Sequence, residues 1–430
     1  MTLIPQYSSP EEFRKAFNRA QVFSPELTAL VREILQEIRE TGNAAVRKFT
    51  EKFDGVSREN LNVSPEEWDS AANDPRMLQL LDKAAGNIRR FHREEFKREQ
   101  SWRLGFTGGF VGQQVTPLKR VGVYVPGGRA AYPSSVLMNV IPAQVAGVDE
   151  IVLVSPPSKE RGMINPLVLA AAKLLGITEV YAIGGAQAIG ALAYGTGSIQ
   201  AVDKITGPGN QYVNEAKRQI FGQCGIDSLA GPSEILVLAD QDADPAAIAS
   251  GLLSQAEHDP QARAILVTPS SEIMQHTLAE LKSQLTQLSR ESIARESLGS
   301  QGALVRVPSL ESAVDLVNQI APEHLELQVA DPEKMLPDIR NAGAIFLGKY
   351  TPEPVGDYWA GTNHILPTAG AARYASALSV RDFLRWSSVL QYNAAKLRSE
   401  KESIQQFARL EGLDAHAQSV EIRLKEEQKG

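Results

Sequence analysis

The stretch Val121-Gly122-Val123-Tyr124-Val125-Pro126-Gly127-Gly128 marks the point at which the sequence changes its pattern. A short run rich in β-branched residues ends in Pro-Gly-Gly, which is typical of a buried strand followed by a turn. Similar runs recur downstream, and helical segments such as residues 166–175 and 212–221 separate them. This βαβα order predicts a mostly parallel sheet covered by helices. The predicted strands of this first series are residues 121–125, 151–154, 180–183, 202–205 and 235–238.

A second series of short apolar runs follows, again with helical segments between them, at residues 264–267, 304–307, 325–329 and 344–347. The first hundred residues and the chain after about residue 379 have helical periodicity instead. In the first of these segments Leu27, Leu30, Ile34 and Ile38 form one apolar stripe, which stops near Gly42. In the last segment Phe383, Trp386 and Leu390 share one helical face. We therefore expect an α/β protein with two parallel-sheet, incomplete Rossmann-like domains and helical extensions at both ends. The early helices could complete the second domain.

Composition excludes several classes of protein. The 430 residues carry 44 basic and 51 acidic side chains, without a dense basic block, so nucleic acid is not expected as a partner. The single cysteine, Cys224, excludes an internal disulfide framework and a cysteine-based zinc site. The N-terminal residues do not resemble a signal peptide, and no apolar run is long enough to span a bilayer. A soluble, cytoplasmic protein without a membrane partner is expected.

Polar clusters around four of the six histidines are candidates for chemistry. A helix starting at Asp244-Pro245 carries Gln255 and His258 on one face near its end, where apolar residues would otherwise continue. His324 follows Glu323, and His364 lies in a polar loop after the strand at 344–347, where open α/β sheets place their ligands. His416 follows Glu411 and Asp414, although a stripe with Leu413, Val420 and Leu424 also fits a boundary core histidine. Such nitrogen and oxygen donors suit zinc, manganese or iron, while a surface or capping cluster is the simpler alternative for each.

Glycine-rich turns at consecutive strand ends form a second candidate site. They occur at residues 125–128, 183–187, 206–210 and 230–233, and they allow a ligand to approach the backbone and helix N-termini closely. A dinucleotide is plausible, but the G-x-G-x-x-G fingerprint is absent. Asp203 lies at the spacing of a ribose-binding acid, and without the fingerprint we interpret it as structural. Cys224 is a third candidate, as a thiol nucleophile, but it has no neighbouring base in the sequence.

The motifs at these positions resemble those of the histidinol dehydrogenase family, from about residue 24 to about residue 425. They are Val-Gly-Val-Tyr-Val-Pro-Gly-Gly at 121–128, Gly-Gly-Ala-Gln-Ala-Ile at 184–189, Gly-Pro-Gly-Asn at 207–210, Ala-Gly-Pro-Ser-Glu at 230–234, Ser-Gln-Ala-Glu-His at 254–258, Pro-Glu-His-Leu at 322–325 and Gly-Asp-Tyr-x-x-Gly-Thr-Asn-His-x-Leu-Pro-Thr at 356–368. The resemblance implies zinc-dependent oxidation of L-histidinol to L-histidine through bound L-histidinaldehyde, with reduction of two NAD, in the last two steps of histidine biosynthesis. It also implies a homodimer with one zinc per subunit.

The resemblance further implies roles for individual residues. The implied zinc ligands are Gln255, His258, Asp357 and His416. General acid and base roles fall on Glu323 and His324, whose side chains should diverge in an extended segment. Substrate contacts are implied for Ser233, Gln255, His258, His324, Asp357, His364, Glu411 and His416, and NAD contacts for Tyr124, Gln187 and Asn210.

The resemblance gives a division of the chain into domains. Residues 1–23 would be an N-terminal helical extension, 24–123 with 235–378 a discontinuous α/β domain carrying the metal site, 124–234 an inserted NAD-binding α/β domain, and 379–430 a helical dimerisation tail that reaches the partner's active site.

Two alternatives from other classes of protein remain. One is a thiol-dependent aldehyde dehydrogenase that acts through Cys224. The other is a non-catalytic family member that binds metal but not NAD, against which the intact Glu323-His324 and Gly-Pro-Gly-Asn segments argue.

Overall fold

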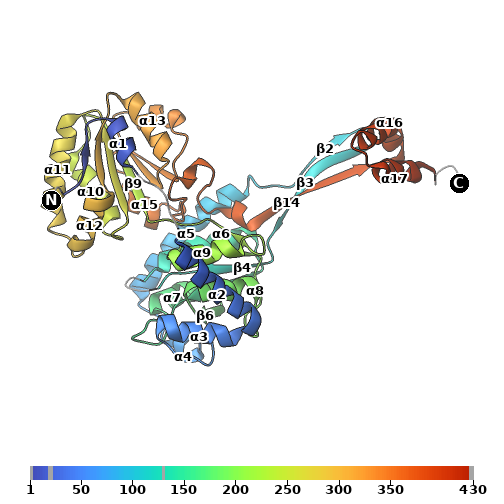
Figure 1. Ribbon diagram of the computed structural model, residues 1–430, viewed down its shortest axis with the longest axis horizontal. Helices are drawn as coiled ribbons and strands as arrows, with labels where there is room; N and C mark the ends of the chain where they lie inside the picture. Colours follow the sequence, from blue (N-terminus) through green and yellow to red (C-terminus); the bar gives the residue numbers. More distant parts are fainter. Residues whose placement is uncertain (1–2, 18–22, 128–130, 426–430) are drawn as a thin grey trace. The chain divides into compact units, whose positions relative to one another are not determined.

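A computed structural model describes residues 3–17, 23–127 and 131–425 (Figure 1). Gly128, which belongs to the first glycine turn, lies outside the described residues. The chain divides into two compact units, each treated separately below. The first contains Met1–Glu95 and Leu118–Phe383, and the second contains Phe96–Pro117 and Leu384–Gly430. In the described parts of the chain, every helix is too short or too polar to span a bilayer.

The first α/β half of the large unit is a five-stranded parallel sheet in the order β6-β5-β4-β7-β8. Each predicted strand of residues 121–205 is confirmed within a residue or two. The strands are β4 (Arg120–Tyr124), β5 (Glu150–Ser155), β6 (Glu179–Ala182), β7 (Lys204–Thr206) and the short β8 (Gly225–Ile226). The helices between them are α6 (Pro133–Ala146), α7 (Pro166–Leu174), α8 (Gly185–Tyr194) and α9 (Gln211–Ile220).

The early helices are α2 (Pro25–Thr41), α3 (Asn43–Asp54), α4 (Pro65–Asp69) and α5 (Pro75–Phe96). Of these, α2 and α3 contribute to the core of the first sheet. The predicted apolar stripe of α2, with Ile34 and Ile38, joins the core formed by α8, α9 and the strands, and the helix ends at Gly42 as predicted. The chain after α3 also runs beside β6, where the amide of Val63 donates to the carbonyl of Val180 at 2.9 Å. The expectation that residues 24–123 belong with the second sheet is therefore wrong for α2 and α3.

The second α/β half is a six-stranded parallel sheet in the order β1-β11-β10-β9-β12-β13. Its strands are β1 (Gln6–Tyr7), β9 (Glu234–Ala239), β10 (Arg263–Thr268), β11 (Ala303–Arg306), β12 (His324–Gln328) and β13 (Ala344–Leu347). Ile235 and Val237 face α10, α11 and α12, while Leu236 and Leu238 face α1 and α13, so β9 is buried on both faces (Figure 1). The associated helices are α1 (Pro10–Ala16), α10 (Pro245–Ala256), α11 (Ser271–Leu285), α12 (Glu291–Gln301), α13 (Leu310–Ile320), α14 (Pro332–Met335) and α15 (Glu353–Tyr358).

Residues 1–23 do not form a purely helical extension. Residues Gln6–Tyr7 form β1, which pairs in parallel with β11 at the sheet edge, and only α1 is helical. A two-residue strand carries no periodic signal, so its pairing is set by the sheet that it joins rather than by its own sequence.

The small unit combines an antiparallel sheet with a helical hairpin. The sheet has the order β14-β3-β2 and consists of β2 (Trp102–Phe106), β3 (Gly109–Pro117) and β14 (Leu384–Tyr392), and the helices are α16 (Ala394–Leu410) and α17 (Asp414–Lys425). The prediction of helix from residue 379 is wrong for Leu384–Tyr392, which form β14, whereas Val380–Phe383 form a short 3-10 helix. Trp386 and Leu390 share a face at a spacing of four, which fits a strand of period two as well as a helix. Pairing with β3 selects the strand.

Candidate active site

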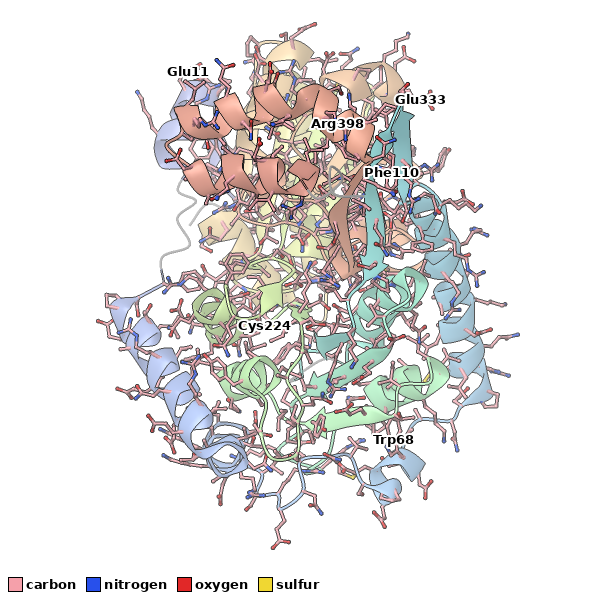
Figure 2. All side chains as sticks on the ribbon, turned by 90° about the vertical axis from the view of Figure 1, so that its right-hand side faces the viewer. Glu11, Trp68, Phe110, Cys224, Glu333 and Arg398 are labelled. Atoms are coloured by element: carbon pink, nitrogen blue, oxygen red, sulfur yellow. The ribbon has the colours of Figure 1, made fainter. Side chains whose placement is uncertain are left out.

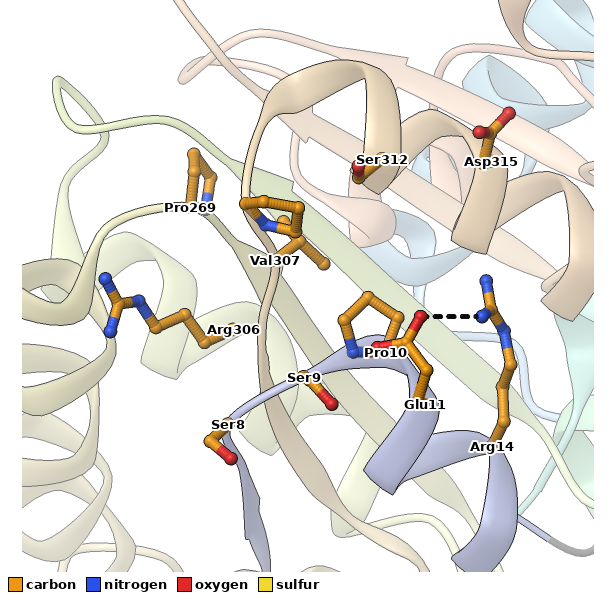
Figure 3. A pocket seen from close by; sticks show the side chains of 11 residues that line it. Ser8, Ser9, Pro10, Glu11, Arg14, Pro269, Arg306, Val307, Ser312 and Asp315 are labelled. Atoms are coloured by element: carbon orange, nitrogen blue, oxygen red, sulfur yellow. Dashed lines mark hydrogen bonds and ion pairs between the residues drawn. The ribbon is translucent and has the colours of Figure 1, made fainter.

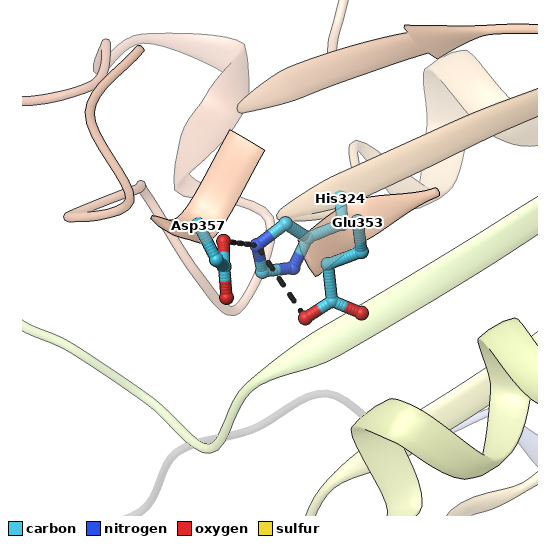
Figure 4. Close-up of side chains that lie close together, drawn as sticks. All are labelled: His324, Glu353 and Asp357. Atoms are coloured by element: carbon cyan, nitrogen blue, oxygen red, sulfur yellow. Dashed lines mark ion pairs between the residues drawn. The ribbon is translucent and has the colours of Figure 1, made fainter. Parts of the chain in front are cut away.

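A histidine and two carboxylates meet at the amino end of β12 (Figure 4). His324 Nε2 lies 3.6 Å from Asp357 Oδ1 and 4.0 Å from Glu353 Oε1. The three potential ligand atoms lie within 4.8 Å of one another, and the three residues form a group that could hold a metal ion. This convergence brings together residues that are predicted from sequence, His324 and Asp357, and one that is not, Glu353.

The pair Glu323-His324 is fixed by the backbone of a neighbouring strand. Glu323 Oε2 accepts a hydrogen bond from the amide of Glu234 at 2.8 Å, and His324 Nδ1 lies 3.0 Å from the carbonyl oxygen of the same residue. Nδ1 must therefore carry the ring proton that it donates, which leaves Nε2 directed toward the carboxylates. Glu323 Oε2 also lies 3.7 Å from His324 Nδ1, so the expected divergence of the two side chains is wrong: both turn toward the peptide of Glu234.

The charges of the cluster shift its pKa values. Burial opposes the protonated form of His324, but the carboxylates of Glu323, Glu353 and Asp357 raise its pKa to about 10. Burial raises the pKa of Glu323 to about 8 and that of Glu353 to about 7. Burial would also raise the pKa of Asp357, but the hydrogen bond and charge of His324 hold it below its usual value. The cluster therefore binds positive charge, either as a proton on His324 or as a cation.

Glu353 is not among the site residues predicted from the sequence, because it lies outside the motifs that carry them. It begins α15 and is buried, its Oε2 accepts from Ser254 Oγ at 3.2 Å, and its backbone amide donates to Glu326 Oε1 at 3.0 Å. Asp357 follows four residues later on the same helix, hence on the same face. That i, i+4 pair of carboxylates, just after a predicted strand, was the signal that could have revealed it.

Gln255 lies in the last turn of α10, and His258 lies in the turn that follows the helix, where the charges of Asp357 and His324 act on it. The Gln255 side chain is fully buried, and neither its oxygen nor its nitrogen has a hydrogen-bond partner among the described residues. Although His258 is exposed by surface area, loss of surrounding water lowers its pKa, and the charge of Asp357 acts in the opposite direction. Because an unsatisfied buried amide is costly, Gln255 fits a bound ligand at this position.

His364 joins the cluster through the backbone of α15. Its Nδ1 lies 3.0 Å from the carbonyl oxygen of Asp357, and burial lowers its pKa. The preceding residue, Asn363, is buried and donates to the carbonyl of Met138 at 2.7 Å, which anchors the loop on α6. The loop of residues 356–368 thus brings His364 beside Asp357, as the sequence analysis expected.

The location of the cluster differs from the expected strand end. His324 is the first residue of β12, and Glu323 contacts the first residue of β9, so the cluster lies at the amino end of the six-stranded sheet. The expected position was after the carboxyl end of β13. The reason is that α15 follows β13 and carries Asp357 back toward the start of β12, as the contact between Glu353 and His324 indicates.

A second cluster lies at the carboxyl end of the five-stranded sheet. Tyr124, the last residue of β4, is buried, and its hydroxyl accepts from the amide of Gly185 at 3.2 Å; burial raises its pKa to about 12. Gln187, also buried, donates from Nε2 to Asp54 Oδ2 at 3.3 Å. Burial raises the pKa of Asp54 to about 6. Tyr124 and Gln187 are thus close together as expected, and Asp54 is an unexpected member.

The glycine turns have packing reasons of their own. A Cβ atom at Gly127 or Gly184 would lie 2.5 Å or less from Pro156, and one at Gly207 would lie 2.0 Å from the carbonyl oxygen of Tyr124. Asn210 caps α9, its Oδ1 accepting from the amides of Tyr212 and Val213, and its side chain is exposed. Glycine at these strand ends therefore permits close backbone approach whether or not a ligand binds.

A short segment connects the two clusters. The side chain of Asn214, in the first turn of α9, exchanges hydrogen bonds with the backbone of Ala230 at 2.7 and 3.1 Å. Four residues later, Glu234 donates to Glu323. Four residues span at most about 14 Å, so the start of α9 and the His324 cluster are within reach of one small molecule. Ser233, half-buried on this segment, lies immediately before β9.

The remaining predicted site residues, Glu411 and His416, belong to the small unit. Both side chains are exposed, while Ala417, Val420 and Leu424 are buried on α17. The alternative interpretation of His416 as a boundary core histidine is therefore wrong.

Cys224 and Asp203 have structural surroundings. Cys224, labelled in Figure 2, is buried, its Sγ lies 3.3 Å from the carbonyl oxygen of Val202, and burial raises its thiol pKa to about 12. A thiolate is the reactive form, so these surroundings contradict the thiol-nucleophile alternative. Asp203 Oδ2 accepts from the amides of Lys119 and Arg120, each at 3.2 Å, as expected for a structural acid.

One pocket of about 550 Å³ lies elsewhere, between α1 and the start of α13 (Figure 3). Arg14, Arg306 and Asp315 are among its lining residues, and Arg14 is paired with Glu11 at 3.3 Å. Its lining contains no member of either cluster.

Comparison with known proteins gives consistent matches. The sequence matches the family model described as histidinol dehydrogenase over residues 17–424. It is 54% identical over 396 residues to histidinol dehydrogenase of Geobacillus kaustophilus, covering 92% of this chain and 93% of the relative. The Bacillus cereus protein of the same name is 48% identical over 426 residues, with 97% and 99% covered. The crystal structure of histidinol dehydrogenase from Elizabethkingia anophelis superposes with a TM-score of 0.94 at 37% identity, with 100% and 99% covered.

Proposed function

Because the chain belongs to the histidinol dehydrogenase family, and is therefore an NAD-dependent oxidoreductase that converts histidinol to histidine, we propose that the cluster around His324 is its active site. The observation that carries this proposal is the fully buried amide of Gln255, which has no partner among the described residues and lies one helical turn before His258. A site built for a ligand leaves such donors and acceptors free until the ligand binds.

The overall reaction requires two bases. Oxidation of the alcohol transfers hydride to one NAD and releases the hydroxyl proton, giving the aldehyde. Water then adds to the aldehyde, and a second hydride transfer yields the carboxylate and a second NADH. His324 accepts the hydroxyl proton at Nε2 in its neutral form, which requires that the carboxylate charges that raise its pKa be offset, and Glu323 accepts a proton from the attacking water. The raised pKa of Glu323, due to burial, supports this role because a base with a pKa near the working pH transfers protons efficiently.

Zinc would be held by Gln255, His258 and Asp357 of one subunit and by His416 of the other. These side chains offer nitrogen and oxygen donors, which suit that metal. The unsatisfied Gln255 amide supports the fit. Bound zinc would anchor the imidazole and amine of histidinol and so fix the substrate next to the bases. Ser233, His364 and Glu411 would complete the substrate site. A second group that could hold the metal consists of His324, Glu353 and Asp357. In that arrangement His324 could not act as a base, because its free nitrogen would bind the metal.

NAD would bind at the carboxyl end of the five-stranded sheet, in contact with Tyr124, Gln187 and Asn210. The short segment from Ala230 to Glu234 supports this placement, since it ties the first turn of α9 to the strand that holds Glu323. The cofactor's reactive ring can then reach the His324 cluster.

The enzyme would act as a homodimer in which the small unit supplies Glu411 and His416 to the partner's site. The apolar surface of that unit supports dimerisation: Leu410 is 79% exposed and Phe407 67% exposed, and Trp102, Leu104 and Leu390 are also open. Such a concentration of exposed apolar side chains marks an interaction surface. Figure 2 labels Phe110 on β3 and Arg398 on α16 of the same unit.

Subunit complementation tests both the site and the dimer. His416→Ala and His258→Ala subunits, each inactive as homodimers, are mixed after reversible dissociation, and NADH formed per histidinol consumed is measured. One site of each mixed dimer would hold only native ligands, so part of the activity should return with two NADH per histidinol. Exchange without recovery would place His416 in its own subunit's site; one NADH with accumulating aldehyde would contradict the two-base assignment.

A further inference from the structure

The dinucleotide-binding half has an acid at each end of β4, and the two acids have different hydrogen-bond partners. Asp203 is bonded to the amides that begin β4, at its amino end. Asp54 lies at the other end, beside Tyr124 and Gln187. An acid that binds a cofactor ribose must lie at the carboxyl ends of the strands, where dinucleotides bind. Asp54 meets that condition, and Asp203 does not.

Asp54 is held in position by three separate elements. It is the last residue of α3, it accepts from Gln187 in the first turn of α8, and its charge acts on Tyr124 at the end of β4. Among the described residues, the one side-chain donor to Asp54 is Gln187 Nε2, which binds Oδ2, so Oδ1 and the second lone pair of Oδ2 can accept from a ligand. Gly55, the next residue, has φ of 70°, which lets the chain turn away immediately after the carboxylate.

The strand order indicates which half of NAD would reach Asp54. The chain after Asp54 runs beside β6, whereas Asn210 follows β7, and the order β6-β5-β4-β7-β8 separates β6 from β7 by three spacings. At about 4.8 Å per spacing, this is roughly 14 Å across the sheet end. The β7 side leads through Ala230 to the His324 cluster, so the nicotinamide belongs there. The adenosine half then lies toward β6 and Asp54.

We propose that Asp54 accepts hydrogen bonds from the 2′- and 3′-hydroxyls of the adenosine ribose of NAD and thereby selects NAD over NADP. The inference rests on the proposed NAD site at Tyr124, Gln187 and Asn210. A carboxylate can accept from both hydroxyls of a ribose diol. A 2′-phosphate at the same position would meet like charge and would leave the carboxylate without its donors. Asp54 is thus a specificity-determining residue of the known reaction.

The pKa of Asp54 agrees with this role. Burial raises the pKa to about 6, and the hydrogen bond from Gln187 offsets only part of that effect. Hydroxyl donors from the ribose would favour the charged form further.

The test is steady-state kinetics of Asp54→Asn with NAD and with NADP. Asparagine keeps an oxygen that accepts from Gln187, so the fold is retained, and an unchanged KM for histidinol verifies this. We expect the ratio of kcat/KM for NAD to that for NADP to fall by about tenfold or more, with a raised KM for NAD and little change in kcat. Competition by ADP-ribose should weaken to the same extent, whereas competition by nicotinamide mononucleotide should not.

Two controls separate the possible failures. Glu51→Gln removes one negative charge from the exposed side of the same helix and should leave every cofactor constant unchanged. Asn210→Ala reports on the proposed NAD site itself. If it raises the KM for NAD while Asp54→Asn changes neither that KM nor the NAD-to-NADP ratio, the ribose role of Asp54 is wrong and the NAD site stands. If neither variant affects NAD, the NAD site is wrong and the role of Asp54 falls with it.

Discussion

Replacing Gln255 by methionine should stabilise the metal-free protein while removing metal-dependent stabilisation. Gln255 is fully buried on α10, and both polar atoms of its amide lack partners among the described residues. Methionine has nearly the same volume and no polar group, so it fills the position without leaving an unsatisfied amide. Comparison of this variant with the native protein should therefore distinguish the destabilisation caused by the unpaired amide from the stabilisation caused by bound metal.

The magnitude follows from the cost of an unsatisfied buried polar group. Such a group destabilises a folded protein by about 1–3 kcal/mol. Relief of that cost corresponds to a rise in the melting temperature of roughly 2–12 °C for a domain of about 150–250 residues, at about 2–4 °C per kcal/mol. Added zinc should then raise the melting temperature of the native protein, as any ligand that binds only the folded state does, and should raise that of Gln255→Met much less.

The assay is differential scanning calorimetry of chelator-treated protein with and without added zinc, together with elemental analysis. Gln144→Met is the matched control, because Gln144 Nε2 donates to the carbonyl of Leu175 at 2.7 Å. Removing that donor leaves the carbonyl unpaired, so the control should lower the melting temperature under both conditions. A lower melting temperature for metal-free Gln255→Met would refute the reasoning, since it would mean that the amide is already satisfied.

Three further outcomes are expected. Glu323→Gln should slow oxidation of histidinaldehyde more than oxidation of histidinol in single-turnover kinetics, because the amide cannot accept a proton from water; equal losses would remove the role assigned to Glu323. Cys224→Ala should retain full activity and lose about 1–2 kcal/mol of stability through a small cavity, whereas loss of activity in folded protein would restore the thiol alternative. Because burial raises the pKa of Asp54 from 3.8 to about 6, the folded state binds more protons than the unfolded chain in this window, so the free energy of unfolding should fall as pH rises through it. Asp54→Asn should reduce that fall in urea titrations, and an unchanged pH dependence would contradict it.

The two parallel sheets could be predicted because buried parallel strands are continuous apolar runs. Residues 121–125 and 235–238, for example, consist mostly of Val, Ile and Leu, and both form strands buried on their two faces. The pattern of such a strand depends on its own sequence alone. The hairpin β2–β3 and β14 were missed because their exposed faces mix polar and apolar residues without a clear period.

The packing of the early helices could not be predicted. The apolar stripe of α2 predicts that one face of the helix is buried, but it does not identify the partner, because an apolar face can pack on any apolar surface of suitable shape. Its partners, α8 and α9, lie more than 140 residues away in sequence, and only the folded chain brings them together. The predicted stop at Gly42 succeeded because it depends on the local backbone, which has φ of 55° there.

Some residues of the proposed site are predictable from the sequence, and others are recognised only in the fold. His324, Asp357 and Gln255 belong to motifs that are informative in sequence, whereas Glu353 lies outside these motifs and Asp54 is recognised only through its neighbours in the fold. Glu353 is recognised by its distance of 4.0 Å to His324, and Asp54 by its hydrogen bond to Gln187, a residue 133 positions away. A single carboxylate is common on protein surfaces, so its chemistry depends on what the fold places beside it.

The segment from Ala230 to Glu234 shows how the fold couples the two halves of the reaction. At its start, Asn214 binds the backbone of Ala230 and so ties it to the first turn of α9, next to Asn210. In its middle, the amide of Gly231 donates to Thr368 Oγ1, at the end of the loop that carries His364. At its end, the peptide of Glu234 holds both Glu323 and His324. A displacement of this segment would move the proposed nicotinamide site and the two bases together. Their relative position, and therefore the geometry of hydride and proton transfer, would be preserved through both oxidations.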